Sequence, residues 1–230
     1  MTLTVHHLGV SQSDRVVWLC EELGIDYVLK KYDRSPVMAP EAYKALHPIG
    51  SAPVIEDGPL KLAESGACVE YIAQIYGKGS LVVQPGAKNY ADYLYWFHFG
   101  NGSLVPAVMY KMVLASSGAS PVNEAVQRYG ARLQRLLALL DQRLGEVPWL
   151  AGDEFTCADI MNLFALTTAR CFQPLDLSEY KNIVAYLKRV SGREGYRRAM
   201  KKGDPDQDIE ALTGAAPPPI FKGYAALQKE

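Results

Sequence analysis

Residues 47–67 have the sequence HPIGSAPVIEDGPLKLAESGA, which predicts a β-hairpin that leads directly into a helix. The apolar pair Val54–Ile55 is followed by a turn over 56–58, in which the glycine can adopt a positive φ. Apolar and polar residues alternate over 60–62, as in a half-buried strand. The acid and the hydroxyl of Glu64–Ser65 are typical of a helix N-terminus.

Two features of this segment indicate a binding site. Proline has no backbone N–H, so Pro53 is expected at the beginning of a strand. A cis Ala52–Pro53 bond would turn the backbone amide and carbonyl of Val54 outward, where they could pair with an extended peptide. Ser65 offers a hydroxyl and the positive end of a helix dipole to a carboxylate. A hairpin with an ordinary helix cap is the alternative, and residue spacing does not separate the two.

Composition and charge exclude several classes of protein. Apolar residues make up 49% of the 230 residues and the formal net charge is −1, which argues against nucleic acid and anionic membranes as partners. No apolar run reaches the roughly 20 residues of a membrane span. The first ten residues lack the features of a signal peptide, so a cytoplasmic location is expected. The four cysteines form no CxxC pair and no histidine pair has HExxH spacing, so no disulfide framework or metal site is predicted.

Upstream of the hairpin, the hydrophobic pattern predicts a βαβ unit. Residues 2–8 and 27–32 read as strands, and residues 13–23 read as a helix that ends at Gly24. A helical crossover requires that the two strands be parallel. With the hairpin and a helix over 65–76, this order predicts a thioredoxin-like domain.

Downstream, the sequence predicts helices only. A long aromatic-rich helix is expected over 89–115, with a bend at Gly100 and Gly102 and a kink at Pro106. Pro121 fits the first turn of the next helix. Residues 156–159, TCAD, have capping-box spacing with aspartate in place of glutamate.

We therefore expect an α+β protein with two domains. The thioredoxin-like domain would cover 1–80, a linker 81–87, and an all-helical domain 88–230. The chain after Lys202 contains three consecutive prolines and is expected to be either an ordered wrap or a loose end.

Three motifs resemble those of the cytosolic glutathione transferases. The segments HPIGSAPVIEDG (47–58), ESGACVEYI (64–72) and GDEFTCADI (152–160) are similar to NPxGxxPVLxDG, ESxAIxxYL and GxxxTxADI of that family. They occur in the family's order and spacing, and the resemblance extends over about residues 3–200. The segment HFGNGSLVP (98–106) further resembles HFxEGSLxP of fungal-type members.

The resemblance implies how glutathione would be held. Glu64 and Ser65 match positions that hold the γ-glutamyl carboxylate and amine, and the backbone of Val54, after Pro53, matches the residue that pairs with the cysteinyl moiety. Thr156 and Asp159 match a structural capping motif, so they imply folding rather than chemistry.

The ligand of the glycyl carboxylate is left open. His47 stands where the family has asparagine, and Ser51–Ala52 occupy the place of a lysine that many members carry before the proline. Three candidates follow: Ser51, His47 and Lys44.

The implied reaction needs glutathione as a thiolate. A free thiol has a pKa of about 8.5, so only a few per cent is ionised near pH 7. A serine is too weak a base to remove the proton, but it can donate a hydrogen bond to the sulfur anion. The segment VSQSDR (10–15) resembles SxxCR of theta- and delta-like transferases, which implies Ser11 as the thiol activator. Some serine branches align one residue earlier, at Val10, which leaves Ser13 as the rival donor. Both serines could also be helix caps.

Aromatic residues offer candidates for a second binding site. The stripe over 90–99 is expected mostly in the core and at a subunit contact, while Tyr110, Phe164 and Phe172 could line an apolar cosubstrate pocket between the two halves. Arg15 could assist an anionic ligand or form a salt bridge on its helix.

The resemblance implies a homodimeric transferase that conjugates the thiol of glutathione to an electrophilic, largely apolar small molecule, as in detoxification. It implies glutathione as cosubstrate and no metal. Two alternatives stay open. One is a glutathione-dependent isomerase or a transferase dedicated to one secondary-metabolite pathway. The other is a non-catalytic ligand-binding or regulatory module of the same fold.

Overall fold

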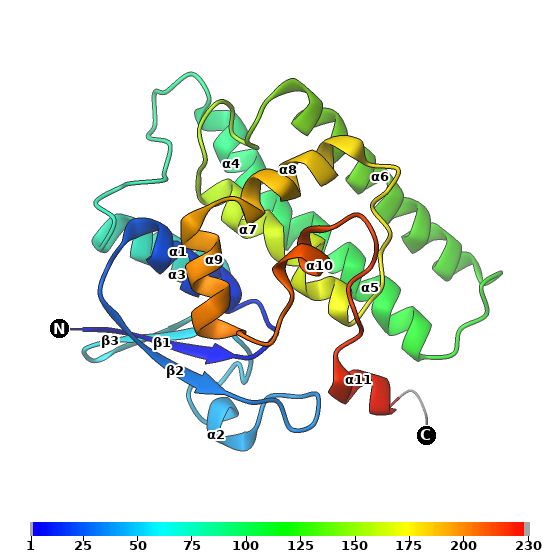
Figure 1. The fold of residues 1–230 in the computed structure, drawn as a ribbon, viewed down its shortest axis with the longest axis horizontal. Helices are drawn as coiled ribbons and strands as arrows, with labels where there is room; N and C mark the ends of the chain where they lie inside the picture. Colours follow the sequence, from blue (N-terminus) through cyan, green and yellow to red (C-terminus); the bar gives the residue numbers. More distant parts are fainter. Residues whose placement is uncertain (1, 228–230) are drawn as a thin grey trace.

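The computed structural model describes residues 2–227 and places a four-stranded sheet beside a helical region (Figure 1). The sheet has the order β2-β1-β3-β4, with β1 parallel to β2 and antiparallel to β3, and with β3 antiparallel to β4. The thioredoxin-like order is therefore confirmed. Its elements are β1 (Leu3–Leu8), α1 (Asp14–Leu23), β2 (Tyr27–Tyr32), α2 (Glu41–Lys44), β3 (Val54–Asp57), β4 (Leu60–Ala63) and α3 (Ser65–Ile75).

Alternation along β1 gives the sheet two different faces. Leu3 and Val5 pack in the large core with α1 and α3, whereas Leu8 and Val54 pack with Tyr43 of α2 on the opposite side. His6 and His7 are both buried, and as neighbours in a strand they point to opposite faces. His7 therefore points toward α1 and His6 toward α2.

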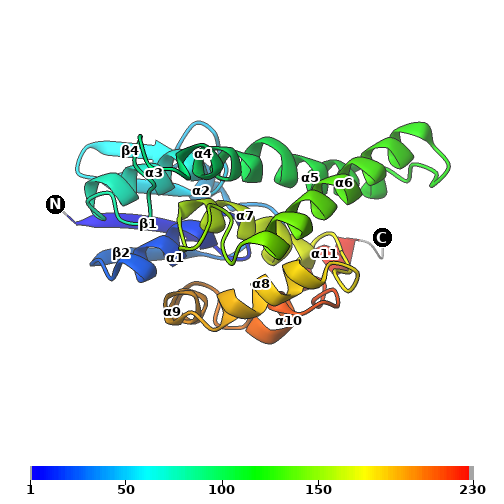
Figure 2. The ribbon, with the colours of Figure 1, turned by 90° about the horizontal axis from the view of Figure 1, so that it is seen from above.

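The helical region surrounds one central helix. Figure 2 shows α7 between α4 and α5 on one side and α9 and α10 on the other. Every residue of α7 is buried. The helices are α4 (Tyr90–Phe99), α5 (Val105–Ser116), α6 (Glu124–Glu146), α7 (Cys157–Leu166), α8 (Lys181–Ser191), α9 (Glu194–Gly203), α10 (Ile209–Thr213) and α11 (Lys222–Leu227), with a 3₁₀ turn over Thr168–Cys171. Among residues 2–227, no helix combines the length and the apolar character needed to cross a membrane.

The capping box at the start of α7 is confirmed. The Thr156 backbone N–H donates to Asp159 Oδ2 at 2.9 Å, and the Ala158 N–H donates to Thr156 Oγ1 at 3.2 Å. Asp159 Oδ1 accepts from the Leu150 N–H at 2.9 Å, so the same carboxylate also holds the loop before the helix.

The single helix expected over 89–115 is instead two helices joined by a π-helical segment, Gly100–Leu104. Gly100 lies against the backbone of α7, where a Cβ atom would clash with the carbonyl oxygen of Met161. Pro106 lies in the first turn of α5, where its missing N–H is tolerated. Pro121 precedes α6 rather than forming its first turn, and Asn123 is the cap, with its side chain accepting from the Ala125 N–H.

We expect the Gly100→Ala variant to lose about 3 kcal/mol of stability, because the new methyl group meets backbone that cannot rotate away. Gly102→Ala is the matched control in the same segment, since a Cβ there meets nothing within 4 Å. Urea unfolding of both variants measures the difference. Equal stability of the two would contradict the proposed close approach of the segment to α7.

The chain after α9 is an ordered wrap, at least to residue 227, which resolves the two expectations for the tail. The Arg170 guanidinium donates to the carbonyl oxygens of Gly214 and Ala215, both at 2.9 Å, and also to those of Leu212 and Ala216. The Phe221 N–H donates to the Cys171 carbonyl at 2.8 Å. These contacts hold the tail over the end of α7.

Candidate functional site

The loop between β1 and α1 brings the two candidate serines together. Ser11 is 5% exposed and Ser13 is fully buried, and their Oγ atoms are 2.7 Å apart. The Leu8 N–H donates to Ser13 Oγ at 3.1 Å, and Ser11 Oγ donates to the Leu8 carbonyl at 2.7 Å. Val10, just before them, has a positive φ of 51°. The rivals for the thiol-activating role are therefore neighbours in one hydrogen-bond network.

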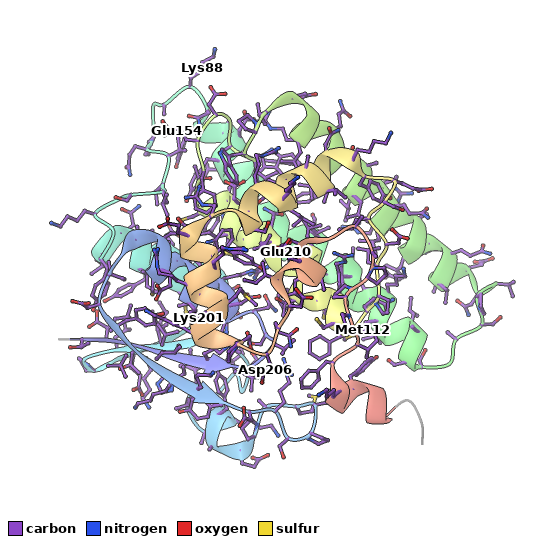
Figure 3. All side chains as sticks on the ribbon, in the orientation of Figure 1. Lys88, Met112, Glu154, Lys201, Asp206 and Glu210 are labelled. Atoms are coloured by element: carbon purple, nitrogen blue, oxygen red, sulfur yellow. The ribbon has the colours of Figure 1, made fainter. Side chains whose placement is uncertain are left out.

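Behind the serines lie two residues that no motif of the sequence assigns to a site. His7 Nδ1 is 2.9 Å from Ser13 Oγ, and His7 Nε2 is 3.1 Å from Asp204 Oδ2. Asp204 Oδ1 accepts from the Val10 N–H at 2.9 Å. Asp204 follows α9, and Figure 3 shows Lys201 on α9 and Asp206 in the turn after it, beside the end of β1. His7 and Asp204 are 197 residues apart in the chain, so no local sequence pattern predicts their contact.

Glu64 and Ser65 lie at a cleft of about 220 Å³. Glu64 is exposed and has a positive φ of 68°, while Ser65, the first residue of α3, is 3% exposed. The cleft lies where the β1–α1 loop, the turn before β3 and the start of α3 meet the π-helical segment. Its lining includes Gln12, Ser51, Ala52, Glu64, Ser65 and Asn101.

A buried cation lies directly behind this cleft. Arg15 is 1% exposed, and its Nη1 donates to Ser65 Oγ at 2.8 Å and to the side-chain oxygens of Gln12 and Asn101, each at 2.7 Å. Burial lowers the pKa of the Arg15 guanidinium to about 10, so it stays charged near neutral pH. Burial also raises the pKa of its neighbour Asp14 to about 6. A full positive charge behind Ser65 favours an anionic ligand at this end of the cleft.

The structure places the position expected to pair with a peptide ligand inside the sheet. The Ala52–Pro53 bond is cis, as the sequence suggested. However, Val54 is 1% exposed and lies in β3 between His6 of β1 and Ala63 of β4. Its backbone groups therefore face neighbouring strands. Ala52, on the other side of Pro53, lines the cleft in its place.

Of the three candidates for the glycyl carboxylate, Ser51 lies at the cleft. His47 turns back on its own loop, with Nδ1 accepting from the Ile49 N–H at 3.3 Å. Lys44 forms an ion pair with Glu41 at 2.7 Å within α2.

The three aromatic residues expected to line one pocket lie in different environments. Phe164 is buried beneath Arg15, whose guanidinium carbon is 5.4 Å from the ring centroid. Tyr110 is 49% exposed and stacks on Tyr129 of α6. Phe172 packs on Phe221 of the tail, with ring centroids 5.5 Å apart. The three side chains therefore face different neighbours.

A second cavity, of about 440 Å³, adjoins the serine loop. It is bounded by Gly9 and Val10, by Arg34, and by tail residues that include Phe221. Ser11 stands in sequence between Val10, which lines this cavity, and Gln12, which lines the cleft of about 220 Å³. Ser11 itself lines neither space, but each of its neighbours in the chain lines one of them. Tail residues thus form one wall of this cavity.

Both halves of the chain match known proteins. The family model described as "Glutathione S-transferase, N-terminal domain" matches residues 1–74, and its C-terminal counterpart matches residues 104–194. "Glutathione S-transferase 3" of Schizosaccharomyces pombe is 31% identical, covering 94% of this chain and 96% of the relative. "Disulfide-bond oxidoreductase YfcG" of Escherichia coli is 28% identical, covering 82% and 89%. A crystal structure of a glutathione S-transferase from Actinobacillus pleuropneumoniae aligns with a TM-score of 0.81 and 30% identity, covering 93% of this chain and 100% of that one.

Proposed function

Because this chain belongs to the glutathione S-transferase family, we propose that it conjugates the thiol of glutathione to an electrophilic, largely apolar small molecule. One observation carries the proposal: a cleft that is backed by the buried Arg15 and lined by Gln12, the residue next to Ser11. The buried cation suits a carboxylate, and the hydroxyl of Ser11 suits a sulfur anion. Glutathione carries both groups.

In this proposal the γ-glutamyl end lies at the start of α3. Ser65 and the N-terminus of the helix receive the carboxylate, with the charge of Arg15 behind them. The exposed carboxylate of Glu64 receives the amine. The backbone beside Ala52 pairs with the cysteinyl unit, and Ser51 is the candidate for the glycyl end.

The sulfur would then lie near Ser11, whose neighbours in the chain line the two spaces. Each unit by which the site lowers the thiol pKa corresponds to about 1.4 kcal/mol in favour of the thiolate. A hydrogen bond from a hydroxyl to an anion is stronger than one between neutral groups, and the N-terminus of α1 adds its dipole. The electrophile would approach from the cavity of about 440 Å³ beside Val10.

Disulfide chemistry through the protein's own thiols is not favoured by the site. Cys20, Cys68, Cys157 and Cys171 are all buried. Burial raises the pKa of Cys68 and of Cys157 to about 12, which keeps both protonated near neutral pH. A thiol reaction at this site would therefore use the sulfur of bound glutathione.

We also propose a cytoplasmic homodimer, and the domain division at residues 81–87 belongs to the same proposal. Apolar side chains on neighbouring helices support a two-fold contact: Leu94 is 37% exposed, Tyr95 52% and Leu139 40%. A role in detoxification requires activity toward many different electrophiles. An isomerase or a dedicated pathway transferase would not show this broad activity.

We expect the Ser11→Ala variant to lose the ultraviolet absorbance of the thiolate that the wild-type protein develops with glutathione at about pH 7. Turnover of a model electrophile should fall on the order of 100-fold, as when one donor to an anion is removed. Glutathione affinity should change little, because the cleft residues remain. Absorbance and calorimetric titration measure the two effects separately.

Ser80→Ala, on an exposed loop, is the control. Loss of the signal in Ser13→Ala but not in Ser11→Ala would assign the role to Ser13 instead. Glutathione binding without a thiolate in the wild-type protein would favour the non-catalytic module. A thiolate without turnover of any model electrophile would favour the isomerase or pathway transferase.

A further inference from the structure

We propose that His7, oriented by Asp204, takes up the proton of the glutathione thiol through Ser13 and Ser11. This inference deepens the proposed function and rests on it. A serine alone cannot act as the base, since its hydroxyl binds an extra proton far too weakly. Imidazole is the side chain whose proton affinity suits this task near neutral pH.

The geometry is a continuous chain of hydrogen-bonding atoms. Asp204 Oδ2 is 3.1 Å from His7 Nε2, His7 Nδ1 is 2.9 Å from Ser13 Oγ, and Ser13 Oγ is 2.7 Å from Ser11 Oγ. Every member is more than nine-tenths buried. The chain runs from the end of α9, across β1, to the loop that separates the two spaces of the site.

The surrounding bonds favour one direction of proton donation. A carboxylate only accepts, so Nε2 of His7 carries a proton and donates it to Asp204. The Nδ1 atom of neutral His7 is then an acceptor, and it faces the hydroxyl of Ser13. Ser13 Oγ accepts from the Leu8 N–H, and its own proton faces two acceptors: His7 Nδ1 at 2.9 Å and the Leu8 carbonyl at 3.2 Å. The shorter contact favours donation to His7. Ser11 Oγ is equally close to the Leu8 carbonyl and to Ser13 Oγ, at 2.7 Å, so the relay requires that its one proton rotate from that carbonyl to Ser13.

The proton transfer balances along this chain. The S–H bond of glutathione breaks and an O–H bond forms at Ser11, whose original proton passes to Ser13. The original proton of Ser13 passes to His7 Nδ1, where an N–H bond forms. The products are a thiolate that accepts a hydrogen bond from Ser11 and an imidazolium beside the Asp204 carboxylate. His7 and Asp204 reach the thiol only through the two serines, so they are positioning residues for this step.

The charged groups near His7 favour this product. Besides Asp204, Asp14 of α1 and Tyr196 of α9 line the same cavity of about 10 Å³, which has room for one water. Arg15 also lines it, and Arg34 donates to the carbonyls of Gly9 and Val10 nearby. Two carboxylates therefore face the imidazolium from α1 and from the end of α9. They offset the repulsion from the guanidinium groups.

The neighbouring His6 provides a comparison within the same strand. His6 also pairs with a carboxylate, because its Nε2 is 3.2 Å from Glu56 Oε2. Its Nδ1 contacts the Tyr32 hydroxyl at 3.0 Å, on the other face of the sheet. Only His7 of this pair adjoins the serines.

The variant Asp204→Asn tests the relay with almost no change in shape. The Val10 N–H must still find an acceptor, so the asparagine oxygen faces Val10 and its NH₂ group faces His7 Nε2. That contact forces the proton of neutral His7 onto Nδ1, which then cannot accept one from Ser13. The equivalent wrong-tautomer effect is known for an aspartate behind a catalytic histidine. Glu56→Gln, in the His6 pair, is the matched control.

The first readout is the pKa of the bound thiol, from thiolate absorbance against pH. We expect Asp204→Asn to raise it by about one unit, which is tenfold less thiolate near neutral pH, with glutathione affinity retained. The control should match the wild type. An unchanged thiol pKa in Asp204→Asn would overturn the relay while leaving the proposed function intact. A wild-type protein that binds glutathione without forming a thiolate would overturn both.

The second readout is the protonation of His7 itself, from ¹⁵N imidazole resonances. Glutathione should convert His7 to the imidazolium form, whereas S-methylglutathione, which has no thiol proton, should leave it neutral. The His6 resonances are the internal reference. A thiolate complex in which His7 stays neutral would overturn the relay, because the proton would then have left by another route.

Discussion

Replacing Asp159 with alanine is expected to lower the free energy of unfolding by about 4 kcal/mol, among the largest effects of any single substitution in this chain. Asp159 is fully buried, and its two oxygens accept from the backbone N–H groups of Leu150 and Thr156. Alanine would leave both donors buried without an acceptor. It would also remove the anchor that joins the loop before α7 to the helix around which the others pack.

Urea unfolding of Asp159→Ala measures this loss, with Glu154→Ala as the control. Glu154 lies on the exposed loop before α7, well away from the core (Figure 3). Thr156→Ala should cost about 1 kcal/mol, the usual effect of losing an N-cap. A loss for Asp159→Ala no larger than that for Thr156→Ala would show that the bond to Leu150 contributes nothing.

The second large effect is expected for Arg170→Met, which should cost about 4 kcal/mol and release the tail. Arg170 is fully buried, and its guanidinium donates to backbone carbonyl oxygens of two segments that are distant in the sequence. One acceptor is Leu175, and others are Gly214 and Ala215 in the tail. Methionine fills the volume but donates no hydrogen bond, so these carbonyl oxygens would accept hydrogen bonds from water instead. The tail would then leave the wall of the cavity beside the serine loop.

Limited proteolysis should therefore cut Arg170→Met after residue 204 under conditions in which the wild type is intact. The KM for an apolar electrophile should rise on the order of tenfold, while glutathione affinity stays within about twofold. Arg189→Met is the control, because Arg189 is half-buried and donates to a single carbonyl, that of Pro148, at 2.9 Å. An intact tail with unchanged KM would show that the wrap does not form the cosubstrate site.

The tail also connects stability to the proposed chemistry. Asp204, its first residue, is held by His7 and Val10, and Phe221, farther along, lines the cavity of about 440 Å³. A segment without a family motif thus reaches both the serine loop and the space for the second substrate. Substitutions there are expected to alter catalysis as well as folding.

Local patterns determined much of this protein. The alternation in residues 2–8 and 60–62, the glycine after the first helix and the spacing of Thr156 and Asp159 depend on neighbours in the chain, so the βαβ unit, the hairpin and the capping box could be predicted. The same holds for Ser11, Ser13 and Ser65, each placed beside the start of a helix by its position in a motif.

Contacts between distant segments decided the rest. The break of the helix at Gly100 depends on the backbone of α7, and the burial of Val54 depends on both neighbouring strands. The link from Asp204 to His7 joins opposite ends of the chain. Burial and hydrogen-bond partners at such positions are set by packing in three dimensions, which hydrophobic periodicity and residue spacing do not encode. The sequence therefore determined which elements form, and only the tertiary structure decided which side chains meet at the site.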